Sequence, residues 1–193
     1  MRLETLTGDA IGDALEDVAR LRIAVFRDWP YLYDGDLAYE RRYLQNYQVN
    51  AGAIVIGVYD GDWLVGASTG APLADHADDF QDALTGSGLD VSTTFYCGES
   101  VLLPRYRGQG IGGQFFDRRE AQARTLGHTH ICFCAVVRPP DHPLHPTRYR
   151  SLERFWEKRG YARLPGAVAH FSWKDVDQPA ETKKPLQFWM RQL

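Results

Sequence analysis

One segment decides how this chain is interpreted: Val101-Leu102-Leu103-Pro104-Arg105-Tyr106-Arg107-Gly108-Gln109-Gly110-Ile111-Gly112-Gly113. It joins an apolar run typical of a strand to a long helical pattern, and four of its last six residues are glycine. The first amides of a helix lack partners and lie at the positive end of its dipole. Glycines let a ligand approach these amides closely, and Arg105 and Arg107 add planar cations that suit phosphate. The segment therefore predicts a pyrophosphate-binding site.

Two other nucleotide sites fit the glycines less well. Residues 108–113 match the dinucleotide pattern G-x-G-x-x-G. That pattern requires an acidic residue about 20 positions later, at the end of the next strand. The next strand pattern, residues 131–137, contains no carboxylate. A phosphate loop for ATP fails as well, because no Gly-Lys-Ser/Thr follows the glycines.

The patterns on either side of this segment alternate between strands and helices. Apolar alternation or continuous apolar runs predict strands at residues 2–6, 53–59, 63–71, 94–103, 130–137, 168–175 and 186–190. Helical spacing predicts helices at residues 12–26, 37–47, 110–126 and 149–159, with a short helix and a loop between 75 and 93. This order predicts a single mixed α+β domain over residues 1–193, with one strand–helix–strand crossover in its middle.

Composition argues against several classes of partner. The 193 residues carry a formal net charge of −3, so the chain as a whole does not match nucleic acid or an anionic membrane. No apolar run approaches the roughly 18 residues that a membrane span needs. The three cysteines do not suit a disulfide framework, and the first residues lack a signal-peptide core. We therefore expect a cytoplasmic protein with no nucleic-acid or membrane partner.

Two motifs resemble those of the GNAT superfamily of acyl-CoA-dependent N-acetyltransferases. Residues 105–112, Arg-Tyr-Arg-Gly-Gln-Gly-Ile-Gly, resemble the family's acyl-CoA motif, Gln/Arg-x-x-Gly-x-Gly/Ala. The preceding Leu102-Leu103-Pro104 resembles its Val-x-Pro lead-in. Residues 155–161, Phe-Trp-Glu-Lys-Arg-Gly-Tyr, resemble the second signature, Phe-Tyr-Glu-Lys-x-Gly-Phe. The strong resemblance covers residues 94–161, and the flanking elements fit by their order.

The resemblance implies a GNAT-like fold and a set of ligand contacts. The fold is a mixed, mostly antiparallel sheet of about seven strands flanked by four helices, with a cleft where the fourth and fifth strands splay apart. Acetyl-CoA would be the co-substrate in that cleft, and no metal is expected. Leu102 and Leu103 would offer main-chain groups to its pantetheine. The other implied cofactor-binding residues are Arg105, Arg107, Gly108, Gln109, Gly110, Ile111, Gly112, Gly113, Trp156 and Lys158.

The resemblance also implies direct attack of an amine on the thioester, which needs a base, a stabilised oxyanion and a proton for the thiolate. Glu99, on the strand that lines the cleft, is the candidate base; it could instead bind a cationic substrate or pair with an arginine. Trp156 occupies the position of the family's acid tyrosine and cannot supply a proton. Tyr149 lies two helical turns earlier on the same face and is the candidate acid. Otherwise it is a packed tyrosine, and the thiolate leaves unassisted.

The acceptor side is expected in residues 27–40, which are dense in aromatic and acidic side chains. Such a mixture suits an organic cation, so Tyr31, Tyr33 and Glu99 are the candidate substrate-binding residues. The aromatic rings could instead only pack this segment on the sheet. The expected function is acetyl transfer to the primary amine of a small amine or amino-acid-like molecule. The alternative is a non-catalytic acyl-CoA-binding sensor, and the resemblance also admits a homodimer.

A proline-rich loop, residues 138–146, is expected at the mouth of the cleft. Its prolines make it stiff, so it is a candidate for an element that selects the substrate. His142 and His145 lie in this loop, but no third ligand accompanies them. The pair therefore does not predict a metal site.

Overall fold

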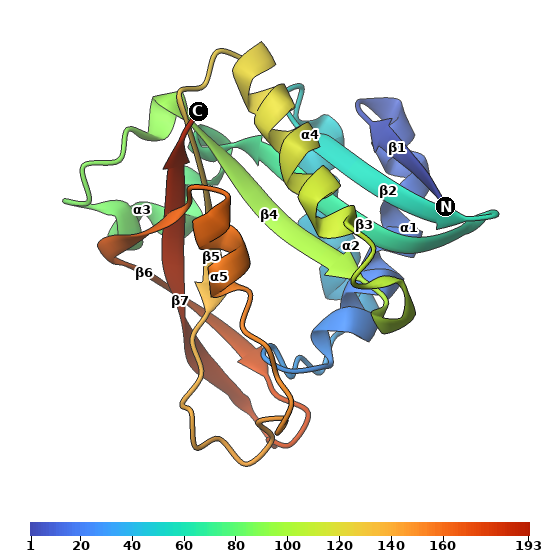
Figure 1. Ribbon diagram of the computed structural model, residues 1–193, viewed down its shortest axis with the longest axis vertical. Coiled ribbons are helices and arrows are strands. Elements are labelled where there is room, and N and C mark those ends of the chain that lie inside the picture. Colours follow the sequence, from blue (N-terminus) through green and yellow to red (C-terminus); the bar gives the residue numbers. More distant parts are fainter.

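A seven-stranded sheet forms the centre of the computed structural model, which describes residues 1–193 (Figure 1). Its strands are β1 (Arg2–Leu6), β2 (Ile54–Asp60), β3 (Trp63–Pro72), β4 (Thr94–Leu102), β5 (His130–Val136), β6 (Ala162–Lys174) and β7 (Glu181–Gln192). They lie in the order β1-β2-β3-β4-β5-β7-β6, and only the β4–β5 pair is parallel. The expected α+β fold with a mixed, mostly antiparallel sheet is therefore confirmed.

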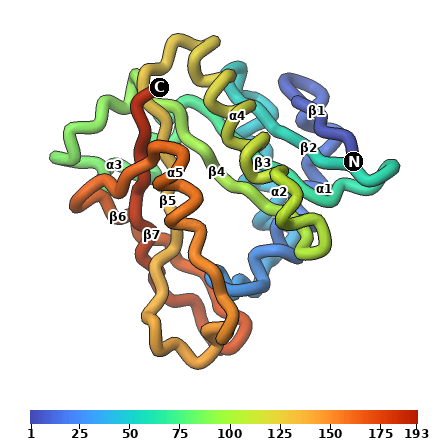
Figure 2. Tube along the Cα trace, viewed as in Figure 1, coloured from blue at the N-terminus to red at the C-terminus, as the bar shows by residue number.

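Helices cover both faces of this sheet. The α-helices are α1 (Asp9–Phe26), α2 (Leu37–Val49), α3 (Ala77–Leu84), α4 (Ile111–Thr125) and α5 (Glu153–Lys158). Helices α1 and α2 lie on one face and α4 and α5 on the other, as the tube in Figure 2 shows. The family resemblance implied four helices, and the structure has five. The additional one is α3, the short helix that the sequence pattern predicted between residues 75 and 93. None of the helices is both long and apolar enough to cross a membrane.

Two elements differ from their expected bounds. Strand β6 begins at Ala162, much earlier than residue 168, because Ala162 and Arg163 already pair with β7. The pairing is then irregular between Arg163 and Val168. That irregularity hides the first half of the strand in the sequence pattern. Helix α5 begins at Glu153, not at residue 149. The Ser151 hydroxyl accepts the Glu153 N–H at 3.2 Å in a local turn that competes with helix before this point.

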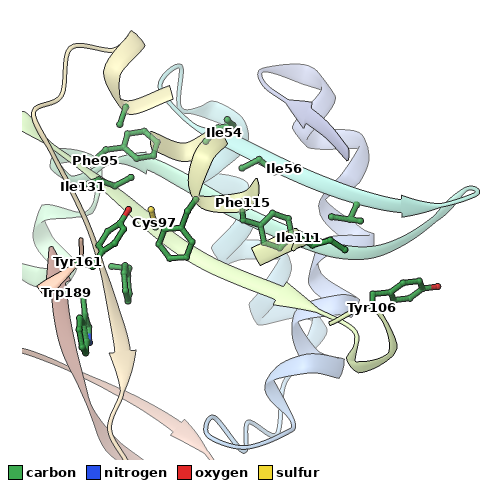
Figure 3. Close-up of a cluster of buried hydrophobic side chains, with 14 of the residues drawn as sticks. Ile54, Ile56, Phe95, Cys97, Tyr106, Ile111, Phe115, Ile131, Tyr161 and Trp189 are labelled. Carbon is green, nitrogen blue, oxygen red and sulfur yellow. The ribbon is translucent and has the colours of Figure 1, made fainter. Parts of the chain in front are cut away.

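The hydrophobic core is divided by the sheet into layers. Figure 3 shows the layer between the sheet and α4, where Ile111 and Phe115 of α4 meet side chains of β2, β4 and β5. A second layer lies between the sheet and α1–α2, and a third surrounds α3 and the β5–β7 end of the sheet. Both helix pairs are therefore fixed to the sheet by apolar burial, which is the main source of the fold's stability.

Strands β4 and β5 pair only at one end. Thr94, Phe95 and Tyr96 lie opposite residues 130–132, and beyond this point the two strands diverge (Figure 1). On its other edge, β5 pairs along its whole length with β7 of the same chain. The edge of β4 from Cys97 onward is consequently left without a neighbouring strand, which confirms the expected splay.

Strand β4 also carries one more residue than its partner β3. Ser68 of β3 lies opposite Ser100, but Gly70 lies opposite Cys97, so the pairing shifts between them. The extra residue forms a β-bulge around Gly98. A side chain at Gly98 has no room, because an added Cβ would lie 2.2 Å from the Tyr47 hydroxyl.

The bulge reverses the direction of every side chain that follows it. Phe95 and Cys97 point to the α4 side of the sheet, whereas Val101 belongs to the layer under α1 and α2. Without the bulge, the period of two in a strand would keep all odd-numbered residues on the α4 side. Glu99 therefore faces α1 and α2, where its carboxylate meets Arg22.

Replacing Gly98 with alanine should destabilise the fold by about 1–3 kcal/mol, because the new methyl group collides with the Tyr47 hydroxyl. The loss should be measured as the free energy of unfolding in urea. The same replacement in a Tyr47→Phe background should cost less, because the nearest obstructing atom is gone. An equal cost in both backgrounds would contradict this account of the bulge.

Candidate active site

The glycine segment forms an open turn between β4 and α4. Gly108 and Gly110 have φ angles of +77° and +80°, in the left-handed region that favours glycine. No atom lies within 4 Å of a Cβ added at either position, so the turn is open to a ligand. The Gly113 N–H already donates to the Gly110 carbonyl at 3.1 Å. The amides left at the helix start are therefore those before Gly113.

The side chains of this turn divide between anchors and exposed cations. Ile111 is buried in the core and fixes the first turn of α4. Arg107 is exposed, and its Nε donates to the Leu102 carbonyl at 3.0 Å. Arg105 is also exposed, with its guanidinium 4.7 Å from the Tyr106 ring centroid. Two exposed cations thus flank an open set of backbone amides, an arrangement that suits a pyrophosphate.

Backbone groups at the open edge of β4 come from alternate residues. The Leu103 N–H donates to Val65 of β3 at 3.0 Å, so Leu102 and Ser100 direct their N–H groups to the opposite, open edge. Ser100 is exposed, whereas its neighbours in the strand are buried. The expectation for Leu103 is corrected: its N–H bonds to β3 and its carbonyl accepts the N–H of residue 106.

Helix α5 places its second signature beside the start of α4. Trp156 packs against Phe133 and Trp189, with ring centroids 4.9 and 5.2 Å away, so it faces the sheet. Lys158 is exposed. The side chain nearest to Gly112 is Phe155, whose Cζ lies 3.9 Å from an added Cβ. The Nη1 atom of Arg159 lies 3.9 Å from a Cβ added at Gly113.

A buried cluster of three charged residues lies under the bulge. Glu99 is 6 % exposed, and its Oε2 lies 2.6 Å from Arg22 Nη1 and accepts the Tyr43 hydroxyl at 3.4 Å. The same guanidinium donates through Nε to Glu40, which is fully buried. The Oε1 atoms of both carboxylates have no hydrogen-bond partner. Two carboxylates therefore share one arginine, and the cluster holds one excess negative charge.

The cluster is built by the two helices that cover this face. Asp36 accepts the Tyr39 N–H at 2.8 Å and starts α2, which places Glu40 in the first turn and Tyr43 one turn later. Burial alone would lower the pKa of Arg22, but Glu99, with Tyr43 and Glu40, raises it well above its usual range. Of the alternatives for Glu99, the structure contains the pairing with an arginine, and its role as a base stays a prediction.

The acceptor loop, residues 29–36, brings both predicted tyrosines towards this cluster. Burial raises the pKa of Tyr31, with further contributions from Cys134 on β5 and Glu99 on β4. The Tyr31 ring packs between α1 and β6, with its centroid 4.3 Å from that of Phe26 and 6.0 Å from that of Trp173. Burial and then the negative charge of Glu40 raise the pKa of Tyr33.

Tyr149 lies in a loop and not on a helix, which corrects the argument made from helical spacing. Its N–H donates to Pro146 at 2.9 Å in a turn, three residues before the cap of α5. The side chain is 37 % exposed, and its ring centroid lies 6.0 Å from that of Trp29. His142 and His145 also flank Trp29. No group of three or more His, Cys, Asp or Glu residues is placed to hold a metal.

A buried ion network fixes the acceptor loop to the β6–β7 hairpin. Arg138 donates to the carbonyls of Pro30 and Tyr31 at 2.8 and 2.5 Å, and its Nη1 lies 2.6 Å from Asp175. Lys184 lies 3.2 Å from the same carboxylate. The geometry of this loop, and hence of its tyrosines, therefore depends on one buried aspartate.

Comparison with known proteins decides the family. The sequence matches the Acetyltransferase (GNAT) family over residues 18–161. The chain belongs to this family. Its class is therefore acetyltransferase. No curated protein matches the sequence.

Solved structures of GNAT proteins share the fold at low sequence identity. A ribosomal-protein-alanine N-acetyltransferase from Brucella melitensis has a TM-score of 0.62 and 11 % identity, with 100 % of both chains covered. A putative acetyltransferase from Salmonella typhimurium, solved with acetyl-CoA, has a TM-score of 0.60 and 12 % identity over 100 % of this chain and 95 % of that one. A polyamine N-acetyltransferase from Drosophila melanogaster has a TM-score of 0.59 and 13 % identity, with 100 % of both chains covered.

The residues of this GNAT chain fit acetyl-CoA. The turn at Gly108 and Gly110 is open where a side chain would stand, and the exposed Arg105 and Arg107 lie beside it. From there the unpaired edge of β4 leads to Ser100, an exposed residue between two buried ones. Acetyl-CoA supplies an acetyl group activated as a thioester, and these two features would hold its pyrophosphate and its pantetheine.

Several residues of this site were not found from the sequence. Arg22 and Glu40 were missed because their pairing joins two helices that the sequence does not relate. The spacing of Glu40, Tyr43 and Tyr47, three and four residues apart, did indicate one polar face on α2. Arg159 was missed because it occupies the position written x in the second signature, to which the motif gives no role.

Replacing Gly110 with aspartate should abolish acetyl-CoA binding, because it puts a negative charge beside the pyrophosphate. Asparagine at the same position is the matched control, since it has nearly the same shape and tolerates a positive φ. Calorimetric titration should show binding weaker in the aspartate variant by roughly tenfold or more. Equal affinity of the two variants would mean that the pyrophosphate binds elsewhere.

Replacing Asp175 with asparagine should cost about 3–5 kcal/mol in unfolding free energy, because Arg138 and Lys184 lose their buried partner. Asp34→Asn is the control, because its pair with Lys174 is partly exposed and should contribute far less to stability.

The stability of the native protein relative to this variant should depend on pH. Burial alone would raise the pKa of Asp175, but Arg138 and Lys184 lower it below its usual value. A lowered folded-state pKa means that the contribution is complete above the unfolded-state pKa of about 3.9 and is lost as pH falls. The difference in unfolding free energy between native protein and variant should therefore shrink below about pH 4. A difference that does not change with pH would contradict the assignment.

Proposed function

We propose that this GNAT chain is an N-acetyltransferase that transfers the acetyl group of acetyl-CoA to a primary amine of a small molecule. The observation that carries the proposal is that the open glycine turn, the unpaired edge of β4 and the buried carboxylate of Glu99 lie within one strand and the turn that follows it. Donor contacts and a carboxylate suited to an amine meet on one strand. Such convergence is what direct transfer between two bound substrates requires.

The proposed reaction is a direct displacement. The amine nitrogen bonds to the acetyl carbon, the carbon–sulfur bond breaks, and coenzyme A leaves as a thiol after taking up a proton. A substrate bound as an ammonium ion first gives one proton to Glu99, the proposed base, and so becomes the free amine that attacks. The nitrogen loses a second proton to solvent as the amide forms. Trp156 has no proton to give, so Tyr149 is the proposed donor to the thiolate, from the loop and not from α5. All three cysteines are buried, and none is needed as a nucleophile.

The electrostatics of the acceptor side support an amine as the substrate. Glu40 and Glu99 share Arg22, which leaves one negative charge uncompensated. A protonated amine would balance it, and the rings of Tyr31 and Tyr33 suit an organic cation. The polyamine N-acetyltransferase among the structural neighbours shows that this fold accommodates such acceptors elsewhere. Because the Glu99 Oε1 atom is buried, the acceptor reaches it only after the side chains over it move aside.

The test is thiol release from acetyl-CoA over a panel of alkylamines, aralkylamines, diamines and amino acids. Turnover with one class of amine, and acetylated product confirmed by mass spectrometry, is the expected result. Binding of acetyl-CoA without release by any amine, peptide or protein N-terminus would refute the catalytic proposal and favour an acyl-CoA sensor.

Replacing Glu99 with glutamine should lower kcat/KM about a hundredfold at low pH and less at high pH, where free amine is abundant. Glu40→Gln is the matched control, because it removes a charge from the same arginine and leaves the proposed base in place. Its ratio to native kcat/KM should not vary with pH. Identical pH profiles for the two variants would show that Glu99 contributes charge and not proton transfer.

A further inference from the structure

Arg119 is a buried cation without a carboxylate partner. It lies on α4, is 1 % exposed, and forms no salt bridge. Its Nη1 donates to the carbonyl of Glu99 at 3.1 Å and to that of Thr69 at 3.4 Å, while its Nε has no partner. A buried charge is normally paired with an opposite charge, because desolvation costs several kcal/mol. A neutral residue could fill this position at lower cost, so the charge calls for another explanation.

A second donor meets the same carbonyl oxygen. The Ser68 hydroxyl of β3 donates to the Glu99 carbonyl at 3.0 Å, so one peptide oxygen receives hydrogen bonds from two elements. Both donors belong to fully buried residues. The Glu99 carbonyl belongs to the bulge of β4, beside the point where β5 has diverged.

Hydrogen bonds to the Glu99 carbonyl also affect the N–H group of the same peptide unit, which faces the open edge of β4. In a trans peptide the C=O and N–H groups point in opposite directions. The Glu99 carbonyl is held from the side of β3 and α4, so the N–H of the same unit, that of Ser100, points to the open edge of β4. Hydrogen bonds to a carbonyl strengthen the N–H of the same peptide as a donor, by about 10–30 % per bond.

We propose that Arg119 and Ser68 are positioning residues that polarise the Glu99–Ser100 peptide, so that the Ser100 N–H is a strong donor to the thioester carbonyl oxygen of acetyl-CoA. The inference rests on the proposed function, because it needs acetyl-CoA along the open edge of β4. Negative charge grows on that oxygen as the amine attacks. A fixed donor aimed at developing charge is among the strongest contributions that a protein makes to such reactions. Arg119 thereby acts through the backbone without contact with either substrate.

The direct test is isotope-edited infrared spectroscopy of acetyl-CoA carrying ¹³C at the thioester carbonyl. The carbonyl band should move to lower frequency on binding to the native protein, because a strong donor weakens the C=O bond. Ser68→Ala and Arg119→Met should each reduce this shift, while the affinity for acetyl-CoA stays within about twofold. With a working acceptor, kcat should fall by about tenfold or more, with little change in the KM for acetyl-CoA.

A matched control separates this role from a structural one. Arg118→Met removes an exposed arginine from the same helix and should leave both readouts unchanged. If Arg119→Met does not fold, Ser68→Ala carries the test alone.

Each outcome decides the matter. A native band shift that persists in Ser68→Ala and Arg119→Met, with unchanged kcat, would overturn the inference and leave the proposed function intact. The absence of any bound band in the native protein would instead refute acetyl-CoA binding at β4, and both proposals would fall together.

Discussion

The site depends on one irregular strand. Strand β4 gains a residue at Gly98 and then loses its neighbour, because β5 pairs with it only as far as Tyr96. The bulge turns the carboxylate of Glu99 towards α1 and α2, and the lost pairing exposes the backbone of Ser100 on the opposite edge. Since the glycine turn continues from the end of this strand, a ligand held by the turn is guided along the exposed edge. A regular strand in this position would remove both features at once.

Two buried arginines contact Glu99, one from each face of the sheet. Arg22 of α1 pairs with the Glu99 carboxylate, and Arg119 of α4 holds its carbonyl. Buried charges of this kind stabilise a fold less than apolar packing would. Natural proteins depart from consistent packing chiefly where function requires it. The concentration of such departures around Glu99, from two separate helices, argues that the chemistry takes place there.

Local patterns in the sequence predicted most of the helices, strands and turns. The contacts between segments far apart in the chain could be found only from the structure. The glycine turn was predictable because helix starts and positive φ angles have local signatures. The start of β6 was not, because Pro165 and Gly166 interrupt its alternation. The start of α5 was not either, because the turn at Ser151 delays the helix to Glu153. Pairs such as Arg22 with Glu40 join separate helices, so periodicity could suggest a polar face but not its partner.

The central claim is that the open edge of β4 and the glycine turn together bind acetyl-CoA. Amide hydrogen exchange followed by mass spectrometry, with and without acetyl-CoA, tests it most directly, because both contacts are made by backbone N–H groups. The account predicts slower exchange on binding in two segments, residues 98–103 and 107–113, with Gly110→Asp as a variant that shows neither change. Binding that slows exchange in only one of these segments, or in neither, would contradict it.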